Sequence, residues 1–216
     1  MKKRNVIILL VCLVIFIGGV FNFSILKNEK ALFMIAEGLD KPSKLYNIVI
    51  KKIYVLSRNK NLSKKLTNYL EQNKNDHLHN LYIQVLGITG EKSSTGILIK
   101  IYTQYQHDMN HYSTMNRIID AMGLIANDDV VPFLETLLID HDKLRVKATQ
   151  YSIARSLYLI TGEKYHYIDD SGRNIELSIT EELLEARNII LNAKGRSRTL
   201  QEMLLLDKLY RPPSEE

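Results

Sequence analysis

Cysteine is nearly absent from this chain, which has Cys12 alone among its 216 residues. A single thiol cannot close an intramolecular disulfide, so no covalent cross-link stabilises the fold. The same absence excludes metal clusters and thiol chemistry beyond the first apolar run. The remaining segment of about 190 residues is long enough to bury a hydrophobic core unaided.

The signatures of several enzyme classes are also missing. Outside Gly18 and Gly19 the glycines are isolated, so no glycine-rich loop can cradle a phosphate. Neither a His-Glu-x-x-His motif nor a nucleophile elbow occurs. Six histidines are present, but His77 and His79 would lie on different faces of a helix. We therefore predict no catalytic residue, no metal site and no cofactor.

Positive charge is in excess only near the N-terminus. The net charge is +5, and the first four residues supply three of these charges. Residues 27–75 carry 11 basic and 4 acidic side chains, whereas the chain from residue 76 onward is acidic overall. The basic part fits either a solvated helix face or a surface for anionic lipid headgroups. No basic patch is interleaved with aromatic residues, so nucleic acid is not expected as a partner.

A long uncharged run occurs at residues 6–26. As a helix this run would span about 31 Å, which is enough to cross the core of a bilayer. Lys2, Lys3 and Arg4 precede it, so the positive-inside rule predicts a cytoplasmic N-terminus. We predict an uncleaved signal-anchor over residues 1–26 and a periplasmic or extracellular location for the rest. The alternative is secretion after cleavage of a signal peptide.

The pentapeptide Ile-Thr-Gly-Glu-Lys occurs twice, at residues 88–92 and 160–164. Its glycines belong to a series of Gly and Asn residues spaced by 31, 37 and 35 positions: Asn59, Gly90, Asn127 and Gly162. Gly and Asn tolerate the left-handed backbone that ends a helix, so we predict a helix C-cap at each position. Caps that recur every thirty-odd residues indicate a helical solenoid.

The residues before three of these caps share an apolar pattern. Apolar side chains occupy the positions two, five and nine residues before the cap: Leu81, Val85 and Ile88; Ile118, Met122 and Ile125; Ile153, Leu157 and Ile160. Offsets of three and four residues place them on one stripe of a helix. A second helix-period stripe follows the caps, so each unit is predicted to be two amphipathic helices joined by a short turn. The alternative is a helical bundle whose caps are evenly spaced by chance.

Residues 115–138, MNRIIDAMGLIANDDVVPFLETLL, resemble HEAT-type repeats, in particular the short bacterial HEAT-like class also found in phycobilisome lyases. The shared pattern is a first helix ending in small apolar residues, an Asn/Asp turn and Val-Val-Pro-Phe-Leu opening the second helix. The resemblance covers residues 43–164 and implies an all-α, HEAT-like α-solenoid. Metal-dependent hydroxylases built on such repeats use His-Glu pairs, which this chain lacks.

The pattern divides the chain into an anchor, a linker, repeats and a C-terminal segment. Gly38 and Pro42 are expected to end a helix that continues from the anchor. After Gly162 the helical pattern stops, and alternation around residues 169–173 predicts a small hairpin or ordered loop. Capping signals at Thr180 and Thr199 predict two final helices that cap the solenoid. The predicted segments are residues 1–26, 27–42, 43–164 and 165–216.

This organisation favours binding over catalysis. We predict a membrane-anchored, extracytoplasmic interaction or scaffold module for a protein or peptide partner in the cell envelope; a plain spacer is a further possibility. In HEAT-like solenoids the second helix of each repeat lines the concave side. The resemblance implies the same position for the second helices of this chain. Candidate contacts are Lys100, Gln104, Glu135, Tyr165, Tyr167, Arg196 and Arg198. The last four also have a structural interpretation. The two tyrosines could pack the loop onto the last repeat, and the two arginines could interact with the ends of helices. The alternative function is a lyase-like enzyme with its chemistry in residues 165–170.

Overall fold

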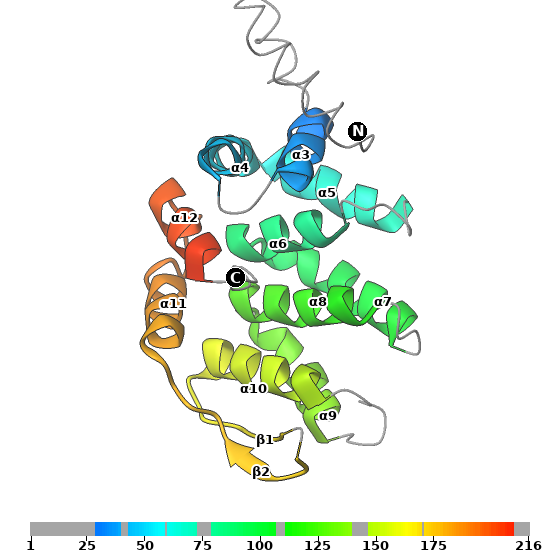
Figure 1. Cartoon of the computed structure of the whole chain (residues 1–216), viewed down its shortest axis with the longest axis vertical. Coiled ribbons are helices and arrows are strands. Elements are labelled where there is room, and N and C mark those ends of the chain that lie inside the picture. Colours follow the sequence, from blue (N-terminus) through cyan, green and yellow to red (C-terminus); the bar gives the residue numbers. More distant parts are fainter. Residues whose placement is uncertain are drawn as a thin grey trace, which may run out of the picture. The chain divides into compact units, whose positions relative to one another are not determined.

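The structure is a computed structural model that describes residues 29–39, 43–58, 60–72, 79–106, 111–139, 147–169 and 171–209, and it is mostly helical (Figure 1). The chain divides into two compact units, residues 1–56 with 212–216 and residues 57–211. The predicted signal-anchor at residues 1–26 lies outside the described residues. Within the described part, no helix combines the length and the apolar character needed to cross a bilayer.

The first unit contains α3 (Glu29–Gly38) and nearly all of α4 (Lys44–Ser57). Helix α3 ends at Gly38, as the sequence predicted, and Pro42 lies outside the described residues. Ser43 caps α4, because its hydroxyl accepts a hydrogen bond of 3.1 Å from the backbone N–H of Tyr46. These two helices account for the described part of the first unit.

The second unit begins with a succession of helices in which two sets alternate along the chain. They are α5 (Lys60–Gln72), α6 (His79–Thr89), α7 (Thr95–Tyr105), α8 (Tyr112–Ile125), α9 (Val131–Ile139) and α10 (Lys147–Thr161). Helices α6, α8 and α10 pack side by side in chain order (Figure 1). Helix α7 packs on α5 and α8, and α9 packs on α10. Short turns join α6 to α7 and α8 to α9, and each of these two-helix units is called a hairpin below. The helices against which α7 and α9 mainly pack are the ones that follow them, α8 and α10.

Glycines allow the helices α6, α8 and α10 to approach closely. A Cβ atom added to Gly87 would lie 2.8 Å from the Cα atom of Ala121, and one added to Gly123 would lie 2.7 Å from that of Ser156. The buried Ser156 hydroxyl donates a hydrogen bond of 2.9 Å to the carbonyl of Ile119. Any larger side chain at these glycines would separate the helix backbones, so close packing depends on them.

The turns that end these helices recur with a constant spacing. Gly90, Ala126 and Gly162 have φ angles of +72°, +52° and +83°, and they lie 36 residues apart. The prediction of a left-handed cap is therefore confirmed at Gly90 and Gly162. It is wrong at Asn127, where φ is −92°, and Asn59 lies outside the described residues. Gly87 and Gly123 each precede a left-handed residue by three positions, so they are equivalent in successive hairpins.

Asn127 has a different role, at the start of the next helical turn. Its side-chain oxygen accepts a hydrogen bond of 3.4 Å from the backbone N–H of Asp129, which caps the short 3-10 helix η3 (Asp128–Val130). Its side-chain amide donates to the Thr95 hydroxyl at 3.2 Å. Because Asn127 begins η3, the left-handed residue that ends α8 is Ala126, one position earlier.

After α10 the chain forms the small hairpin that the sequence predicted. Strands β1 (His166–Ile168) and β2 (Asn174–Glu176) pair antiparallel, and β1 packs on α10. Helix α11 (Glu181–Asn192) follows, with the Thr180 hydroxyl accepting a hydrogen bond of 3.3 Å from the Leu183 N–H. This helix begins directly after Thr180, as the capping signal predicted.

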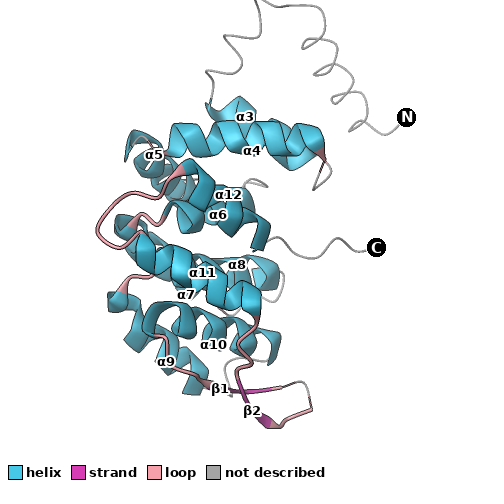
Figure 2. Cartoon of the chain, turned by 90° about the vertical axis from the view of Figure 1, so that its left-hand side faces the viewer, coloured by secondary structure: helices cyan, strands magenta, loops and turns pink. Residues whose placement is uncertain are grey.

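Helix α12 (Leu200–Leu209) opens with the predicted capping box. The Thr199 hydroxyl accepts from the Glu202 N–H at 3.2 Å, and the Glu202 carboxylate accepts from the Thr199 N–H at 2.7 Å. Helix α11 packs on α10, whereas α12 packs on α6 (Figures 1 and 2). The C-terminal helices thus lie alongside the preceding hairpins from α10 back to α6. The sequence-based expectation of a cap did not include this contact with α6.

Candidate functional site

Arg198, between α11 and α12, inserts into the C-terminal ends of α6 and α8. It is 5% exposed, and its Nη1 donates hydrogen bonds of 2.9 and 2.8 Å to the carbonyls of Gly87 and Ile88. Its Nη2 donates to the carbonyl of Leu124. Ile88 and Leu124 each lie two residues before a left-handed turn, so they are equivalent positions. Because the last carbonyls of a helix have no partner within the helix and carry partial negative charge, one guanidinium satisfies two helices.

Arg187, on α11, makes similar contacts with the end of α10. Its Nε and Nη2 donate to the carbonyls of Tyr158 and Thr161, both at 3.3 Å, and its guanidinium lies over the Tyr158 ring at 5.7 Å from the centroid. A Cβ atom at Gly162 would overlap Arg187 Nη2, and one at Gly90 would lie 2.8 Å from the Cζ of Arg198. Each glycine of the repeated pentapeptide therefore faces an arginine from the C-terminal segment.

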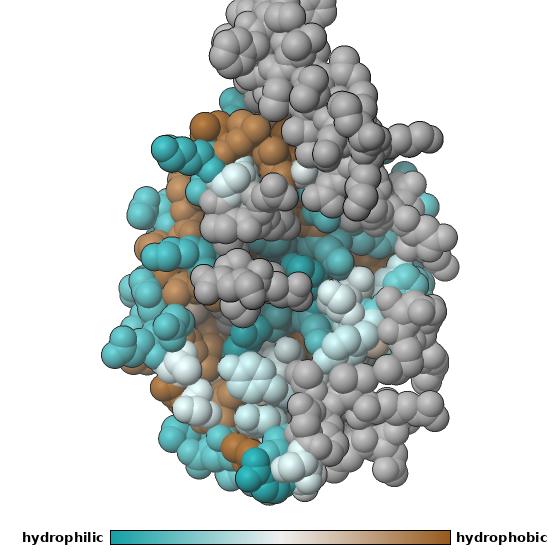
Figure 3. All heavy atoms as spheres, viewed as in Figure 1, coloured by the Kyte–Doolittle hydropathy of each residue, from teal (hydrophilic) through white to brown (hydrophobic). Residues whose placement is uncertain are grey.

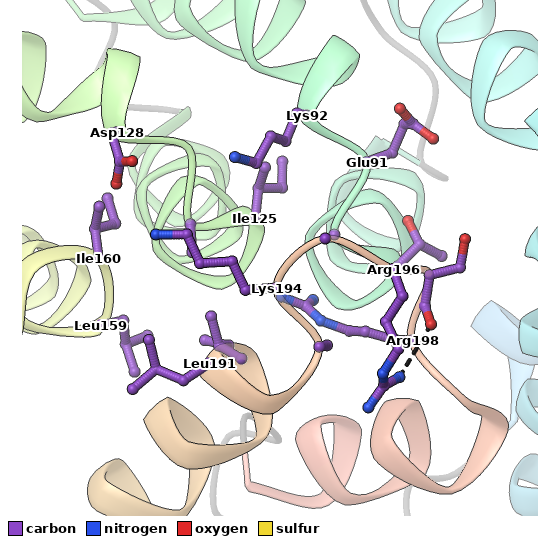
Figure 4. A pocket seen from close by; sticks show the side chains of 17 residues that line it. Glu91, Lys92, Ile125, Asp128, Leu159, Ile160, Leu191, Lys194, Arg196 and Arg198 are labelled. Carbon is purple, nitrogen blue, oxygen red and sulfur yellow. Dashed lines mark hydrogen bonds between the residues drawn. The ribbon is translucent and has the colours of Figure 1, made fainter.

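A pocket of about 490 Å³ opens beside Arg198 (Figure 4). Its walls are the turns that follow α6 and α8, the end of α10 and the segment from the end of α11 to Arg198. The apolar part of the lining consists of Ile125, Leu159, Ile160, Ile190 and Leu191. The charged part consists of Glu91, Lys92, Asp128, Lys194, Arg196 and Arg198. The pocket therefore combines an apolar lining with charges of both signs.

Lys92, Asp128 and Lys194 have exposed side chains with no hydrogen-bond or ion-pair partner within the described part of the chain. They come from three separate segments, and Figure 4 shows all three side chains directed into the same space. Glu91, by contrast, accepts a hydrogen bond of 3.1 Å from the Ser93 hydroxyl. Two cations and one anion in the pocket are thus available to a ligand.

Arg196, at the edge of the pocket, forms an ion pair with Glu202. Its Nη1 and Nη2 donate to the two carboxylate oxygens at 2.9 and 2.5 Å. The hydrogen bond from Arg196, followed by those from the Thr199 N–H and hydroxyl, lowers the pKa of Glu202 from 4.5 to about 2. Because the pKa is lower in the folded state, ionised Glu202 stabilises the fold above pH 4.5, and this stabilisation is lost as the pH falls towards 2.

We expect Glu202→Gln to lower the free energy of unfolding by about 1 kcal/mol at pH 7, since the neutral amide keeps the cap but loses the ion pair. Near pH 2 the variant and the wild type should unfold at the same denaturant concentration. Urea unfolding of both proteins at the two pH values measures this. Glu185→Gln, at an exposed position on α11, removes the same charge and should show no such pH dependence. A difference for Glu202→Gln that does not change with pH would contradict the assignment.

The predicted contacts on the second helices lie outside this pocket. Lys100, on α7, is 3.6 Å from the Glu71 carboxylate, and Gln104 is exposed. Glu135, on α9, accepts a hydrogen bond of 3.1 Å from the Tyr165 hydroxyl. Tyr167 packs edge-on against Tyr151, with ring centroids 5.5 Å apart. The structure thus brings Glu135 and Tyr165 together, a contact that their sequence positions did not indicate.

The hairpin loop uses its polar groups internally. Asp169 accepts hydrogen bonds from the Ser171 N–H and hydroxyl at 2.9 and 2.7 Å, and from the Arg173 N–H and guanidinium at 2.7 to 2.9 Å. The Ser171 hydroxyl, followed by the Arg173 N–H, holds the pKa of Asp169 well below its usual range. His166 is exposed, and Asp170 lies outside the described residues. These contacts favour a structural role for Asp169, because its oxygens are engaged in the turn.

The sequence-based prediction included Arg196 and Arg198 from the pocket but missed Lys92, Asp128 and Lys194. One signal was present, because Lys92 and Lys164 end the two copies of the pentapeptide. Lys164 pairs with Glu176 of the hairpin at 2.8 Å, whereas the first copy continues into η1 and α7, and Lys92 has no partner in the part of the chain that the structure describes. Within the described residues, no group of three His, Cys, Asp or Glu side chains is placed to hold a metal ion.

Comparison of the chain with protein-family models, with curated proteins and with solved structures finds no match in any of the three. The resemblance of residues 115–138 to HEAT-type repeats therefore stays a prediction from the sequence. No function is carried over from a relative, and the pocket chemistry and the helix arrangement are the basis for the proposals below.

Proposed function

We propose that this chain is a membrane-anchored, extracytoplasmic interaction module that binds a protein or peptide partner of the cell envelope through the pocket at the helix C-termini. The observation that carries this proposal is the combination, in one pocket, of an apolar lining with three charged side chains that have no partner among the described residues. The succession of helical hairpins also supports it, because HEAT-like solenoids present such surfaces to partners. The N-terminal run at residues 6–26 supports the membrane anchor.

The lining indicates the chemistry of the bound segment. Leu191 is 40% exposed at the pocket, so an apolar side chain of a partner would bury surface that water now contacts. Lys92 and Lys194 outnumber Asp128, so an acidic side chain or a terminal carboxylate would find two complementary charges. A pocket of this size lies within the usual range for ligand sites, about 300 to 1,000 Å³. A peptide segment with adjacent apolar and acidic groups fits these features.

Binding is favoured over catalysis by the residue types that line the pocket. Neither histidine nor cysteine occurs among the described lining residues, so Ser197 has no imidazole there to activate it. Asp128 is exposed, and Arg198 is occupied by helix carbonyls. The groups that remain available, Lys92, Asp128 and Lys194, are suited to ion pairing.

The double variant Lys92→Glu/Lys194→Glu tests the proposal in affinity purification of the full, tagged chain from detergent-solubilised envelopes. We expect recovery of the bound partner to fall at least about tenfold, because two attractive contacts with an acidic segment become repulsive. The control Lys64→Glu/Lys100→Glu makes the same charge change at exposed positions on α5 and α7 and should keep the partner.

Two outcomes would contradict this proposal. If the control loses the partner while the pocket variant keeps it, the contact surface lies on the second helices. If the wild-type chain recovers no protein above an untagged control, it is not an interaction module under these conditions of extraction. Circular dichroism of both variants should match the wild type, because all four lysines are exposed.

A further inference from the structure

One face of α4 combines lysines with exposed apolar residues. The residues of this face, called here the α4 basic face, are Lys44, Ile48, Lys51, Lys52 and Val55. Ile48 is 66% exposed and Val55 is 45% exposed, and apolar side chains reach the surface over α4 (Figure 3). At the helical rotation per residue, these five positions fall within an arc of about 100°. They therefore form a single stripe along the helix.

The opposite side of α4 accounts for its role in the fold. That side carries Tyr46, Val49, Ile50, Ile53 and Tyr54, each at most 6% exposed. The apolar residues that α4 needs for packing are thus already buried, and Ile48 and Val55 are additional to them. A singly exposed apolar residue is ordinary. Two of them on one stripe with lysines call for a different explanation.

The charges of the α4 basic face are all of one sign. Helix α4 contains no acidic residue, and the three lysine side chains are exposed with no partner within the described part of the chain. A solvated helix face in a soluble domain usually mixes both signs, whereas helices at a bilayer surface place lysines beside apolar residues. Lysine stems extend towards phosphate groups while shorter apolar side chains enter the headgroup region.

We propose that the α4 basic face docks on an anionic lipid surface. This inference rests on the proposed membrane anchor, which would end at residue 26, only 18 residues before α4 begins. An anionic bilayer complements the three lysines, and its headgroup region accepts Ile48 and Val55. An acidic protein surface would complement the lysines equally well, but the short distance along the chain from the predicted anchor favours lipid.

The test uses the full chain with Cys12→Ser and Ile48→Cys, labelled with an environment-sensitive dye and placed in bilayer discs of phosphatidylcholine with or without phosphatidylglycerol. We expect a blue shift, and quenching by a lipid-borne quencher, only in the anionic discs and only at low salt. Lys51→Gln/Lys52→Gln should weaken docking about 30-fold, since each close lysine contributes about fivefold. The control Lys64→Gln/Lys208→Gln removes the same charge from exposed positions on α5 and α12 and should leave the signal unchanged.

A dye at Ile139→Cys, on α9 and 75% exposed in the wild type, should not respond to lipid charge. Equal signals at Ile48→Cys in both kinds of disc would overturn the inference. So would a signal that rises with protein concentration and not with lipid charge, which would indicate contact with a second copy. Retention of the chain in discs at high salt reports on the anchor separately. If it is not retained, flotation with vesicles of the same two compositions measures docking without the anchor.

Discussion

Replacing Arg198 with alanine should lower the free energy of unfolding by about 3 to 5 kcal/mol. The arginine is 5% exposed and donates to the carbonyls of Gly87, Ile88 and Leu124, so its removal leaves buried acceptors at the ends of two helices without these donors. It also removes a cation from the negative ends of both helices. Urea unfolding of the full chain in mild detergent, followed by far-ultraviolet circular dichroism, measures the change.

Two variants of the same segment serve as controls. Arg198→Lys keeps the positive charge, but an ammonium group lacks the planar guanidinium that reaches several carbonyls at once. This variant should therefore be more stable than Arg198→Ala and less stable than the wild type. Arg196→Ala removes an exposed arginine whose pair is with Glu202, and it should cost less than about 1 kcal/mol. If Arg198→Ala and Arg196→Ala have equal effects, Arg198 does not hold α6 and α8 together.

Replacing Gly162 with alanine should lower the free energy of unfolding by about 2 to 4 kcal/mol. A left-handed conformation is unfavourable for alanine, and Gly162 has a φ of +83°. The new Cβ would also displace the guanidinium of Arg187 from the carbonyls of Tyr158 and Thr161. The same denaturation experiment measures the effect.

The matched change in the preceding hairpin should have the opposite sign. Ala126 holds the equivalent left-handed position with a φ of +52°, so Ala126→Gly should raise the free energy of unfolding by about 0.5 to 1 kcal/mol. If Ala126→Gly instead lowers the free energy of unfolding, the greater conformational entropy that glycine gives the unfolded chain outweighs the relief of backbone strain. A Gly162→Ala variant as stable as the wild type would show that Arg187 moves aside without loss.

Features that depend on neighbouring residues along the chain were predictable. The start of α11, the capping box of α12 and the hairpin between β1 and β2 follow from caps and alternation within a few residues. The left-handed turns at Gly90 and Gly162 follow from the lack of a Cβ atom. In each case the deciding interactions are local, so the sequence contains them directly.

The prediction at Asn127 was wrong because two local preferences competed. Asparagine tolerates a left-handed conformation but also caps helices, and a short sequence motif cannot decide between these roles. In the structure Asn127 contacts Asp129 and reaches Thr95 of the preceding hairpin, and this second contact is tertiary. Ala126 then becomes left-handed, which makes the spacing of the turns a constant 36 residues.

The pocket could not be predicted, because its residues come from separate segments. Lys92, Asp128 and Lys194 meet only because α12 packs on α6 and α11 on α10. No periodicity relates residues 181–209 to the hairpins, so the sequence offers no register for that packing. Arg198 was predicted as a possible partner contact, with a helix-end role as its alternative; the structure places it at the helix ends.

The sequence by itself determined the helices, the left-handed caps at Gly90 and Gly162, the break after Gly162 and the C-terminal helices, because short-range sterics and hydrogen bonds set these features. The tertiary structure decided which residues stay available for function. Arg187 and Arg198 donate hydrogen bonds to carbonyls at the ends of α6, α8 and α10, whereas Lys92 and Lys194 have no partner among the residues that the structure describes. The burial and pairing of a charged side chain depend on segments far apart in the chain. Only the packing of those segments therefore decides which charged side chains stabilise the fold and which can bind a partner.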